Sequence, residues 1–308
     1  MKAMAIEKYG GPEVLKLMDL PIPALRDDDV LVEVHATSVN PIDWKIRRGM
    51  LKENLHYQFP LIPGWDVAGV VKEVGPKVRG FRPGDEVYGK PDVTRNGAYA
   101  EYTAVQESLL APKPGSLTFE EAASLPLAGI TAWQAMVEVA GVHSGQKVLV
   151  HAGSGGVGSL AIQIAKAQGA HVAATTSGRN KEFVAALGAD LIIDYEKQDF
   201  TKLVSGYHVV LDTIGGEVMR RSYAVLRKGG LLIEIADLPD EAEAARQGVK
   251  AVYMSSRADR KKLEQLTRLA EGALRPMVSS VMPLEEAAKA QEISETGHVR
   301  GKLVLKVR

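Results

Sequence analysis

The first third of the chain consists of short segments in which apolar and polar residues alternate. The segment DVLVEVHATSV (residues 29–39) places valine or alanine at every second position from 30 to 36, which is the period of a strand with one buried face. Short apolar runs follow in DVAGVVKEV, DEVYG and AYAEYTAV, and the glycine- and proline-rich stretch GPKVRGFRPGD separates two of them. Closely spaced strands and turns predict a small barrel or folded sheet.

The pattern changes near Thr118. From Lys147 onward, β-branched runs alternate with runs of helical period. The expected strands are KVLVHA, HVAATT, DLIID, HVVLD, GLLIEI and KAVYM. Helices are expected to begin near Gly156, Asn180, Asp199 and Gly216, and a less distinct fifth connection contains EAEAARQG. This repeated order predicts an α/β fold with a doubly wound parallel sheet and helices on both faces.

After about Lys261 the order loosens into a helix, a strand (PMVSSVM), a helix and a final strand, KLVLKV. The final strand is additional to the six expected in the parallel sheet. Its presence is explained if it returns to the first domain. We therefore expect a β-rich domain of residues 1–121 completed by residues 262–308, and a second domain of residues 122–261.

Composition narrows the function classes. Lys plus Arg equals Asp plus Glu at 38 each in 308 residues, so no net charge attracts nucleic acid or an anionic membrane. The sequence has no run of 18 apolar residues, no apolar signal core at its start and no cysteine. Disulfides, thiolate nucleophiles and cysteine-bound metals are thereby excluded. We expect a soluble cytoplasmic protein.

The stretch KVLVHAGSGGVGSL (residues 147–160) carries the strongest motif. Gly153, Gly155 and Gly158 form a G-x-G-x-x-G between a strand and a helix. In this context the glycines serve a tight turn, close approach to a pyrophosphate and close packing of helix on strand. The phosphates are expected on the N–H groups of the helix N-terminus. The expected phosphate-binding residues are Ser154, Gly155, Gly156, Val157 and Gly158.

A hydrolase is the competing interpretation of the same stretch. Residues 152–156 (AGSGG) approach the G-x-S-x-G nucleophile elbow, in which Ser154 would be the nucleophile. That interpretation needs an acid and then a histidine downstream, for which His171, His208 and His298 are available. It leaves Gly158 unused and places the elbow in the first βα unit, so dinucleotide binding is favoured.

The second strand of this domain indicates which dinucleotide is bound. NAD enzymes usually have Asp or Glu about 20 residues after the glycines, where it binds the ribose 2′-hydroxyl. Here the segment has Thr175, Thr176, Ser177 and Arg179, with no carboxylate to repel a 2′-phosphate. Hydroxyls and a guanidinium can bind such a phosphate, so NADP(H) is favoured. The alternative is that these residues only cap the helix near Asn180.

The seven histidines form no i, i+4 pair, so a zinc site is not expected. Motifs along nearly the whole chain resemble the zinc-independent medium-chain dehydrogenase/reductase family, in its quinone oxidoreductase and enone reductase branch. They are SVNPIDWKIRRG, PGWDVAGVV, GDEVYG, GAYAEY, LPLAGITAW, GSGGVG, LGADLIIDY, DTIGG and GHVRGKLVLKV. Zinc-dependent relatives have His-Glu where this chain has Trp65-Asp66. The resemblance implies a GroES-like catalytic domain, a Rossmann domain for NADP(H), and metal-free hydride transfer to quinones or α,β-unsaturated carbonyls (enones and enals).

The resemblance also implies site residues. Lys45 is expected to contact both cofactor and substrate and to stabilise charge on the carbonyl oxygen, although a solvated lysine beside Arg47 and Arg48 is the alternative. Asn40 is expected to bind the nicotinamide ribose or the substrate, and Asp43 either orients Lys45 or caps the following helix. Further cofactor contacts are expected at Thr131, Tyr195 and Arg300. Asn180 stands where relatives often have a lysine, and Arg179 is expected to substitute for it.

Two questions stay open at this stage. The chain is either a reductase of quinones or enones, or an NADPH-binding structural or sensor protein without significant turnover. It is also either a monomer or a homodimer paired through the edge strand KAVYM.

Overall fold

The alternating segment near residue 30 forms the central strand of its domain. A computed structural model describes residues 1–308 and divides into two compact units, Met1–Leu127 with Ala258–Arg308 (unit 1) and Ala128–Arg257 (unit 2). In unit 1, β3 (Asp29–Ser38) pairs antiparallel with β4 (Val67–Val74), β6 (Tyr102–Gln106) and β15 (Lys302–Lys306). Valines at every second position of β3 pack in one core cluster with Val67, Val71 and Phe81, as the period predicted.

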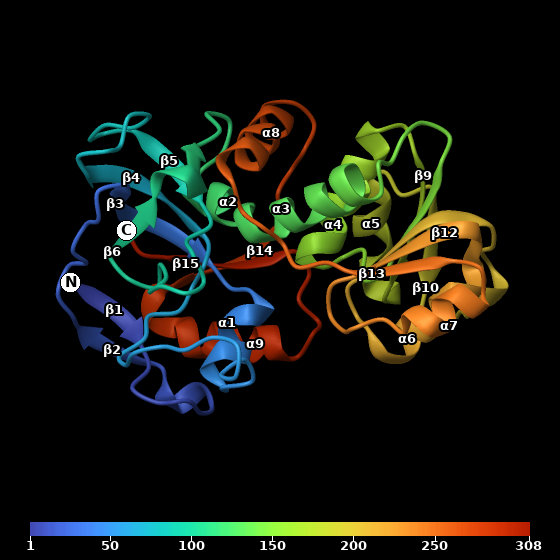
Figure 1. Cartoon of the computed structure of the whole chain (residues 1–308), viewed down its shortest axis with the longest axis horizontal. Coiled ribbons are helices and arrows are strands. Elements are labelled where there is room, and N and C mark those ends of the chain that lie inside the picture. The colour runs from blue at the N-terminus through green and yellow to red at the C-terminus, as the bar shows by residue number, and fades with distance from the viewer. The chain divides into compact units, whose positions relative to one another are not determined.

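The sheet of unit 1 has seven strands in the order β14-β15-β3-β4-β5-β7, with β6 paired to β3 beside this path. The other strands of this sheet are β5 (Glu86–Gly89), β7 (Leu110–Pro112) and β14 (Val278–Pro283). A separate two-stranded sheet consists of β1 (Lys2–Ala5) and β2 (Lys16–Asp19). The helices assigned wholly to this unit are α1 (Pro41–Arg47), α2 (Phe119–Ala123), α8 (Arg260–Glu271) and α9 (Ala287–Glu295). Figure 1 shows the C-terminal strand β15 beside the N-terminal strand β3, which confirms that the last strand returns to the first domain.

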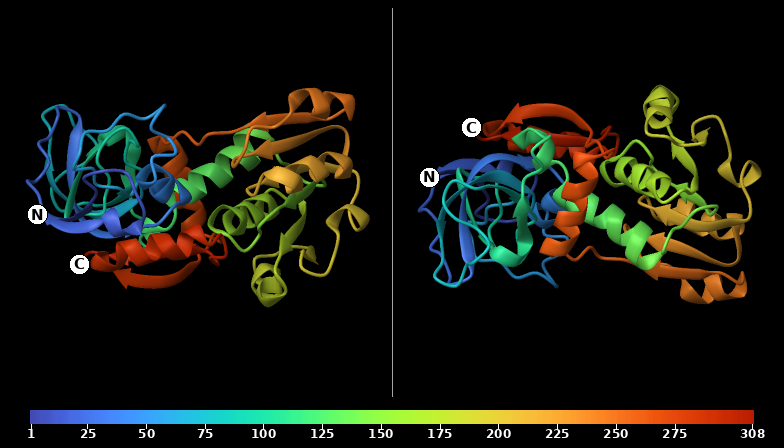
Figure 2. Two further views of the ribbon diagram at one scale, coloured as in Figure 1. Left: turned by 90° about the horizontal axis from the view of Figure 1, so that it is seen from below. Right: turned by 90° about the horizontal axis from the view of Figure 1, so that it is seen from above.

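Unit 2 contains a parallel sheet of six strands in the order β10-β9-β8-β11-β12-β13. All six predicted strands form, as β8 (Lys147–Val150), β9 (His171–Thr176), β10 (Leu191–Asp194), β11 (Tyr207–Asp212), β12 (Leu226–Glu234) and β13 (Lys250–Tyr253). The helices are α4 (Gly156–Ala167), α5 (Lys181–Ala186), α6 (Gly216–Ser222) and α7 (Glu241–Arg246). Helices cover both faces of the sheet (Figure 2), so the doubly wound prediction is confirmed.

The segment that leads from one unit to the other is helical. Helix α3 (Pro126–Trp133) continues into a π-helical stretch, Gln134–Val139. None of the helices combines the length and apolar character needed to cross a membrane.

One helix prediction was wrong. The helix expected near Asp199 is a single 3-10 turn, Phe200–Lys202, in which the Asp199 carboxylate accepts the Thr201 N–H at 3.0 Å. Phe200 and Val204 are buried in the sheet's core cluster. A capping acid followed by apolar residues therefore marks a connection here without extending into a full helix.

Candidate active site

Asn40 is held at both ends of its side-chain amide. It follows β3 and caps α1 with extended backbone angles (φ −125°, ψ 153°), the conformation favoured before Pro41. Its Nδ2 donates to Asp66 Oδ2 at 2.7 Å, and its Oδ1 accepts from the ammonium group of Lys302. The side chain is almost fully buried. Its orientation is therefore fixed by two charged groups.

Asp66 gathers the groups around Asn40. Its buried carboxylate also accepts the Ser38 hydroxyl at 2.6 Å and the Leu127 N–H at 2.7 Å. The Lys302 Nζ lies 3.5 Å from Asp66 Oδ2 and donates to the Val39 carbonyl at 2.9 Å. Burial lowers the pKa of Lys302, and Asp66 opposes that shift. The pair is thus a buried ion pair whose remaining hydrogen bonds are satisfied by the protein.

Asp43 lies in the first turn of α1 and faces the core. Its Oδ2 accepts the Asn40 N–H at 2.8 Å and the Tyr99 hydroxyl at 2.9 Å. Burial raises the pKa of Asp43 to about 7. These contacts match the helix-capping interpretation of Asp43 and provide no contact with Lys45.

Lys45 is half-buried on α1, with its Nζ 5.8 Å from the centre of the Trp44 ring. No carboxylate forms an ion pair with it. Arg47, in contrast, is fully buried: its Nη1 donates to Gln291 at 2.9 Å, and it forms an ion pair with Glu295 on α9. Arg47 therefore joins α1 to α9 and is not part of a solvated basic turn.

The position that carries a His-Glu pair in zinc-dependent relatives is built as core here. Trp65 is fully buried and donates from its indole nitrogen to the Arg95 carbonyl at 3.1 Å. No group of three or more His, Cys, Asp or Glu side chains in the chain is arranged to hold a metal ion. Tyr88 is also buried, and its hydroxyl donates to the Leu263 carbonyl at 2.6 Å.

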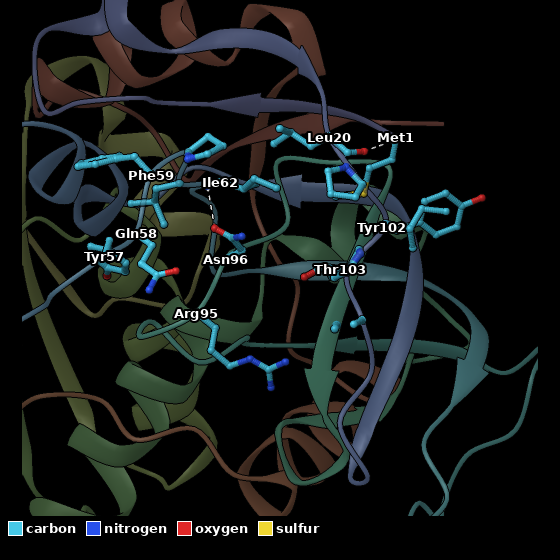
Figure 3. A pocket seen from close by; sticks show the side chains of 18 of the residues that line it. Met1, Leu20, Tyr57, Gln58, Phe59, Ile62, Arg95, Asn96, Tyr102 and Thr103 are labelled. Carbon is cyan, nitrogen blue, oxygen red and sulfur yellow. Dashed lines mark hydrogen bonds between the residues drawn. The ribbon is translucent and has the colours of Figure 1, made fainter.

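Unit 1 also contains a cavity of about 930 Å³, which Arg95 helps to line. Figure 3 shows its lining, which includes Leu20, Phe59, Ile62, Asn96 and Thr103. The guanidinium of Arg95 at its wall forms a bidentate pair with buried Asp29 at 2.6 and 2.8 Å. Its lining contains none of the predicted site residues, so we do not assign the chemistry to it.

The glycine loop of unit 2 has the predicted geometry between β8 and α4. A Cβ on Gly158 would lie 2.3 Å from the carbonyl oxygen of Ala152, so only glycine fits where the helix crosses the strand end. A Cβ on Gly155, which caps α4, would lie 3.3 Å from the carbonyl oxygen of Ala152. Ala152 has φ +51° and is the one non-glycine residue with positive φ. Strain of this kind at a ligand loop is a recognised mark of function.

His151, the residue before the glycine loop, is held by two hydrogen bonds of its side chain. Its Nδ1 lies 3.0 Å from the Thr175 hydroxyl and its Nε2 lies 2.9 Å from the Ser222 hydroxyl. Ser222 donates to the Val218 carbonyl at 2.7 Å, so it accepts from His151 Nε2–H. Burial lowers the pKa of His151 to about 3, which keeps the ring neutral. This chain of hydrogen bonds fixes the loop's starting point against β9 and α6.

The hydroxyls expected at a 2′-phosphate face the protein interior. Thr175, Thr176 and Ser177 are all buried. The Thr175 hydroxyl also accepts the Ala152 N–H at 3.3 Å, and Ser177 accepts from Asn180 Nδ2 at 3.2 Å. Ser177 makes no side-chain cap bond, which does not favour the capping alternative for it. Of this set, Arg179 is half-buried and is the most exposed.

A carboxylate does reach the loop after β9, contrary to the expectation from sequence. Glu196, two residues beyond β10, accepts the Gly178 N–H at 3.3 Å. A neighbouring cavity of about 410 Å³ is lined by Gly178, Lys181, Asp194, Lys197 and Gln198. The acid comes from the third strand's end, a pairing that spacing along the second strand does not reveal. Lys197, which also follows β10, lines this cavity together with Lys181 from the start of α5.

The other expected cofactor residues have varied settings. Thr131 is buried on α3, Tyr195 is half-exposed directly after β10, and Arg300 is exposed in the turn before β15. Ser154 accepts from Asn180 Nδ2 at 3.2 Å, which joins the glycine loop to the loop after β9. Gly156 and Val157 form the first turn of α4, where N–H groups have no partner within the helix.

Sequence reasoning missed Lys302, Tyr99 and His151. Lys302 directly precedes the apolar run LVL of its strand, and Asp66 interrupts the apolar run PGWDVAGVV. A charge within an apolar strand is the signal that such a residue is buried with a partner. The partner itself could not be identified, because 236 positions separate residues 66 and 302 in the sequence.

Comparison with known proteins identifies the family of the chain. Residues 26–115 match the family model described as alcohol dehydrogenase GroES-like domain, and residues 187–305 match the one described as zinc-binding dehydrogenase. The chain is 39% identical over 319 residues to 2-methylene-furan-3-one reductase of Solanum lycopersicum, covering 99% of this chain and 79% of that protein. It is 39% identical over 316 residues to the chloroplastic NADPH-dependent alkenal/one oxidoreductase of Arabidopsis thaliana, with the same coverage.

Among solved structures, the quinone oxidoreductase from Coxiella burnetii superimposes with a TM-score of 0.93 at 39% identity, covering 100% of this chain and 99% of that one. The relatives exceed the identity and coverage at which a shared family is established, and their names agree with the branch that the motifs indicated. The chain belongs to the medium-chain dehydrogenase/reductase family, in its quinone oxidoreductase and enone reductase branch.

Proposed function

We propose that the protein is a metal-free NADPH-dependent reductase that transfers hydride to quinones or α,β-unsaturated carbonyls. The glycine loop at the end of β8 carries this proposal. Strand order reverses between β8 and β11, and open α/β sheets bind dinucleotides at that point. The relatives named as an alkenal/one oxidoreductase, a furanone reductase and a quinone oxidoreductase support the substrate class and NADPH.

The residues of unit 2 fit NADP(H). Gly156, Val157 and Gly158 offer the N–H groups of a helix N-terminus to the pyrophosphate, and Gly155 leaves room for its approach. Arg179, Lys181 and Lys197 supply positive charge beside the loop after β9. Tyr195 offers a half-exposed ring to the adenine ribose. Because Glu196 binds the Gly178 N–H, a 2′-phosphate at that amide has to displace this carboxylate.

The chemistry follows from the groups that unit 1 offers. When bound, NADPH supplies the hydride. The relatives' names support an acceptor that is electrophilic through conjugation, and negative charge develops on its oxygen when hydride arrives. The Lys45 ammonium has no ion pair of its own, and Asp66 occupies one of the two N–H groups of Asn40. We assign the stabilisation of that oxygen to Lys45 and Asn40, and the positioning of Asn40 to Asp43, Asp66 and Lys302.

Turnover is the direct test of the function. Oxidation of NADPH and of NADH is measured with a simple quinone and a short-chain enone, with EDTA present throughout. We expect turnover with NADPH above that with NADH, unaffected by EDTA. Tight NADPH binding without turnover of either acceptor would instead favour an NADPH-binding structural or sensor protein.

The two glycines of the loop are predicted to behave differently. Gly158→Ala places a methyl group against the Ala152 carbonyl and should lower the free energy of unfolding by about 1–3 kcal/mol. Gly155→Ala brings its methyl group only 3.3 Å from the same carbonyl oxygen, so it should lower the thermal midpoint less than Gly158→Ala does. It should weaken NADPH binding by about tenfold or more, because its methyl group occupies the pyrophosphate's approach. Thermal denaturation and fluorescence titration measure these effects. Unchanged NADPH affinity in Gly155→Ala would contradict the assigned phosphate site.

The Lys302–Asn40 contact is tested by a double-mutant cycle. Asn40→Ala should lower kcat/KM about 100-fold and Lys302→Met about 10- to 100-fold, by loss of transition-state stabilisation. If Lys302 acts through Asn40, the double variant should be no slower than Asn40→Ala alone. NADPH affinity in unit 2 should stay unchanged in all three. Lys306→Met, at an exposed lysine of the same strand, is the matched control. Additive losses would show that Lys302 acts independently.

We further propose that the protein works in the cytoplasm as a homodimer. The absence of cysteine suits a reducing compartment. Strand β13 is an edge of the parallel sheet, and pairing with a second copy would satisfy its outer hydrogen-bonding groups. Light scattering on the purified chain should give twice the mass of 33.2 kDa. A mass of one chain at all concentrations would exclude the dimer.

A further inference from the structure

Two acidic side chains lie next to each other inside unit 2. Asp212 is the last residue of β11 and Glu234 is the last residue of β12. The strands are adjacent and parallel, and these two residues are direct partners in the register. Both side chains are fully buried. Register partners on parallel strands point to the same face, so the two carboxyl groups meet at the carboxyl end of the sheet.

One oxygen of each carboxyl group fixes the loop that follows its strand. Asp212 Oδ1 accepts the N–H groups of Ile214 at 2.8 Å and Gly215 at 3.3 Å. Glu234 Oε1 accepts those of Ala236 at 2.7 Å and Asp237 at 3.2 Å. The loops at residues 213–216 and 235–238 are therefore held by acids at their bases.

The other two oxygens have no donor. Asp212 Oδ2 and Glu234 Oε2 are buried without any hydrogen-bond partner from another group. The two residues are register partners, and each carboxyl group influences the pKa of the other. Two carboxylates can face each other only if one keeps a proton and donates it to the other. A single shared proton satisfies both orphaned oxygens.

The charged groups that act most strongly on the pair are acidic. The charges that act on the pair are each other and Asp237 in the second loop. Burial raises the pKa of Tyr223 beside α6, and Asp240 and Glu243 at α7 add further negative charge near it. Tyr253 on β13 is the register partner of Glu234. His151 on the β8 side is neutral. Burial, followed by the charge of Asp212, raises the pKa of Glu234 to about 7, and burial also raises the pKa of Asp212.

The two loops are connected to the dinucleotide site. Asp237 Oδ2 accepts the Gly216 N–H at 2.8 Å, which joins the loops where α6 begins. The Thr213 hydroxyl donates to the His151 carbonyl at 3.3 Å, and the His151 ring contacts Ser222 on α6. His151 directly precedes the glycine loop. Loosening of the loop after β11 therefore reaches the loop that receives the phosphates through two hydrogen bonds.

We propose that Asp212 and Glu234 share one proton, and that this proton positions the loops at 213–216 and 235–238 for dinucleotide binding. Asp212 and Glu234 are positioning residues, since neither is exposed to a ligand. This inference rests on the proposed NADPH-binding function. When the proton leaves, two buried carboxylates repel each other and the hydrogen bonds at the loop bases weaken.

Glu234→Gln replaces the shared proton by an amide. Its Oε1 can accept from Ala236 and Asp237, and its Nε2 can donate permanently to Asp212 Oδ2. NADPH dissociation constants are measured by fluorescence titration between about pH 6 and pH 9. We expect the constant to rise about tenfold or more in the parent protein and about threefold or less in Glu234→Gln. Glu241→Gln, which removes an exposed carboxylate of the same unit, should follow the parent.

The thermal midpoint gives a second readout with a defined sign. A carboxyl group whose pKa is raised in the folded state stabilises fully below its unfolded value of 4.5, and that stability is lost as the pH rises through about 7. The midpoint should therefore fall less between these values in Glu234→Gln than in the parent. Asp43 in unit 1 contributes a fall of the same sign in both proteins, so the difference between them reports on Glu234.

The outcomes separate this inference from the proposed function. Equal pH dependence of NADPH binding in parent and Glu234→Gln would overturn the shared-proton inference alone. No NADPH binding by the parent at any pH would overturn both. If Glu234→Gln does not fold, Asp212→Asn is the mirror variant, because its amide can accept from Ile214 and Gly215 and donate to Glu234. A pH-independent Asp212→Asn supports the inference, and a parent-like profile overturns it.

Discussion

The buried carboxylate of Asp66 connects four segments of unit 1. It accepts hydrogen bonds from Ser38 at the end of β3, from Asn40 before α1 and from Leu127 in α3, and it pairs with Lys302 at the start of β15. Four segments distant in sequence thus converge on one buried negative charge. Loss of one partner from such a pair leaves an uncompensated buried charge, which typically costs about 3–5 kcal/mol. The position of Asn40, and with it the proposed chemistry, depends on this interaction.

In unit 2, hydrogen bonds of buried polar residues likewise fix the loops at the carboxyl ends of the strands. Asp212 and Glu234, at the carboxyl ends of β11 and β12, accept N–H groups of the loops that follow them, and the His151 ring bonds to the hydroxyls of Thr175 and Ser222. Buried hydrogen bonds of this kind rigidify the loops that they support. The glycine loop can then hold strained backbone at Ala152, because its surroundings leave it no alternative conformation.

Much of this could be predicted from the sequence, because strand period, glycine spacing and turn residues are local signals. They located all six strands of the parallel sheet and the close contact at Gly158. The missed features depend on what lies across the fold. The segment HVAATTSGRN does not show that Thr175 bonds to His151 or that Glu196 reaches Gly178. Likewise, the residues after Asp199 do not show that the helical turn there ends after three residues. The ion pair between Lys302 and Asp66 also forms only because β15 pairs with β3 in the folded chain.

The central claim is that hydride passes from the nicotinamide to a carbon made electrophilic by conjugation. Reduction of a cyclic enone with NADPH deuterated at C4, run separately with each stereoisomer, tests it most directly by mass spectrometry and NMR of the product. The account predicts that one stereoisomer places deuterium on the carbon β to the carbonyl and leaves the carbonyl intact. Deuterium on the carbonyl carbon of an alcohol product, or none in the product with either stereoisomer, would contradict it.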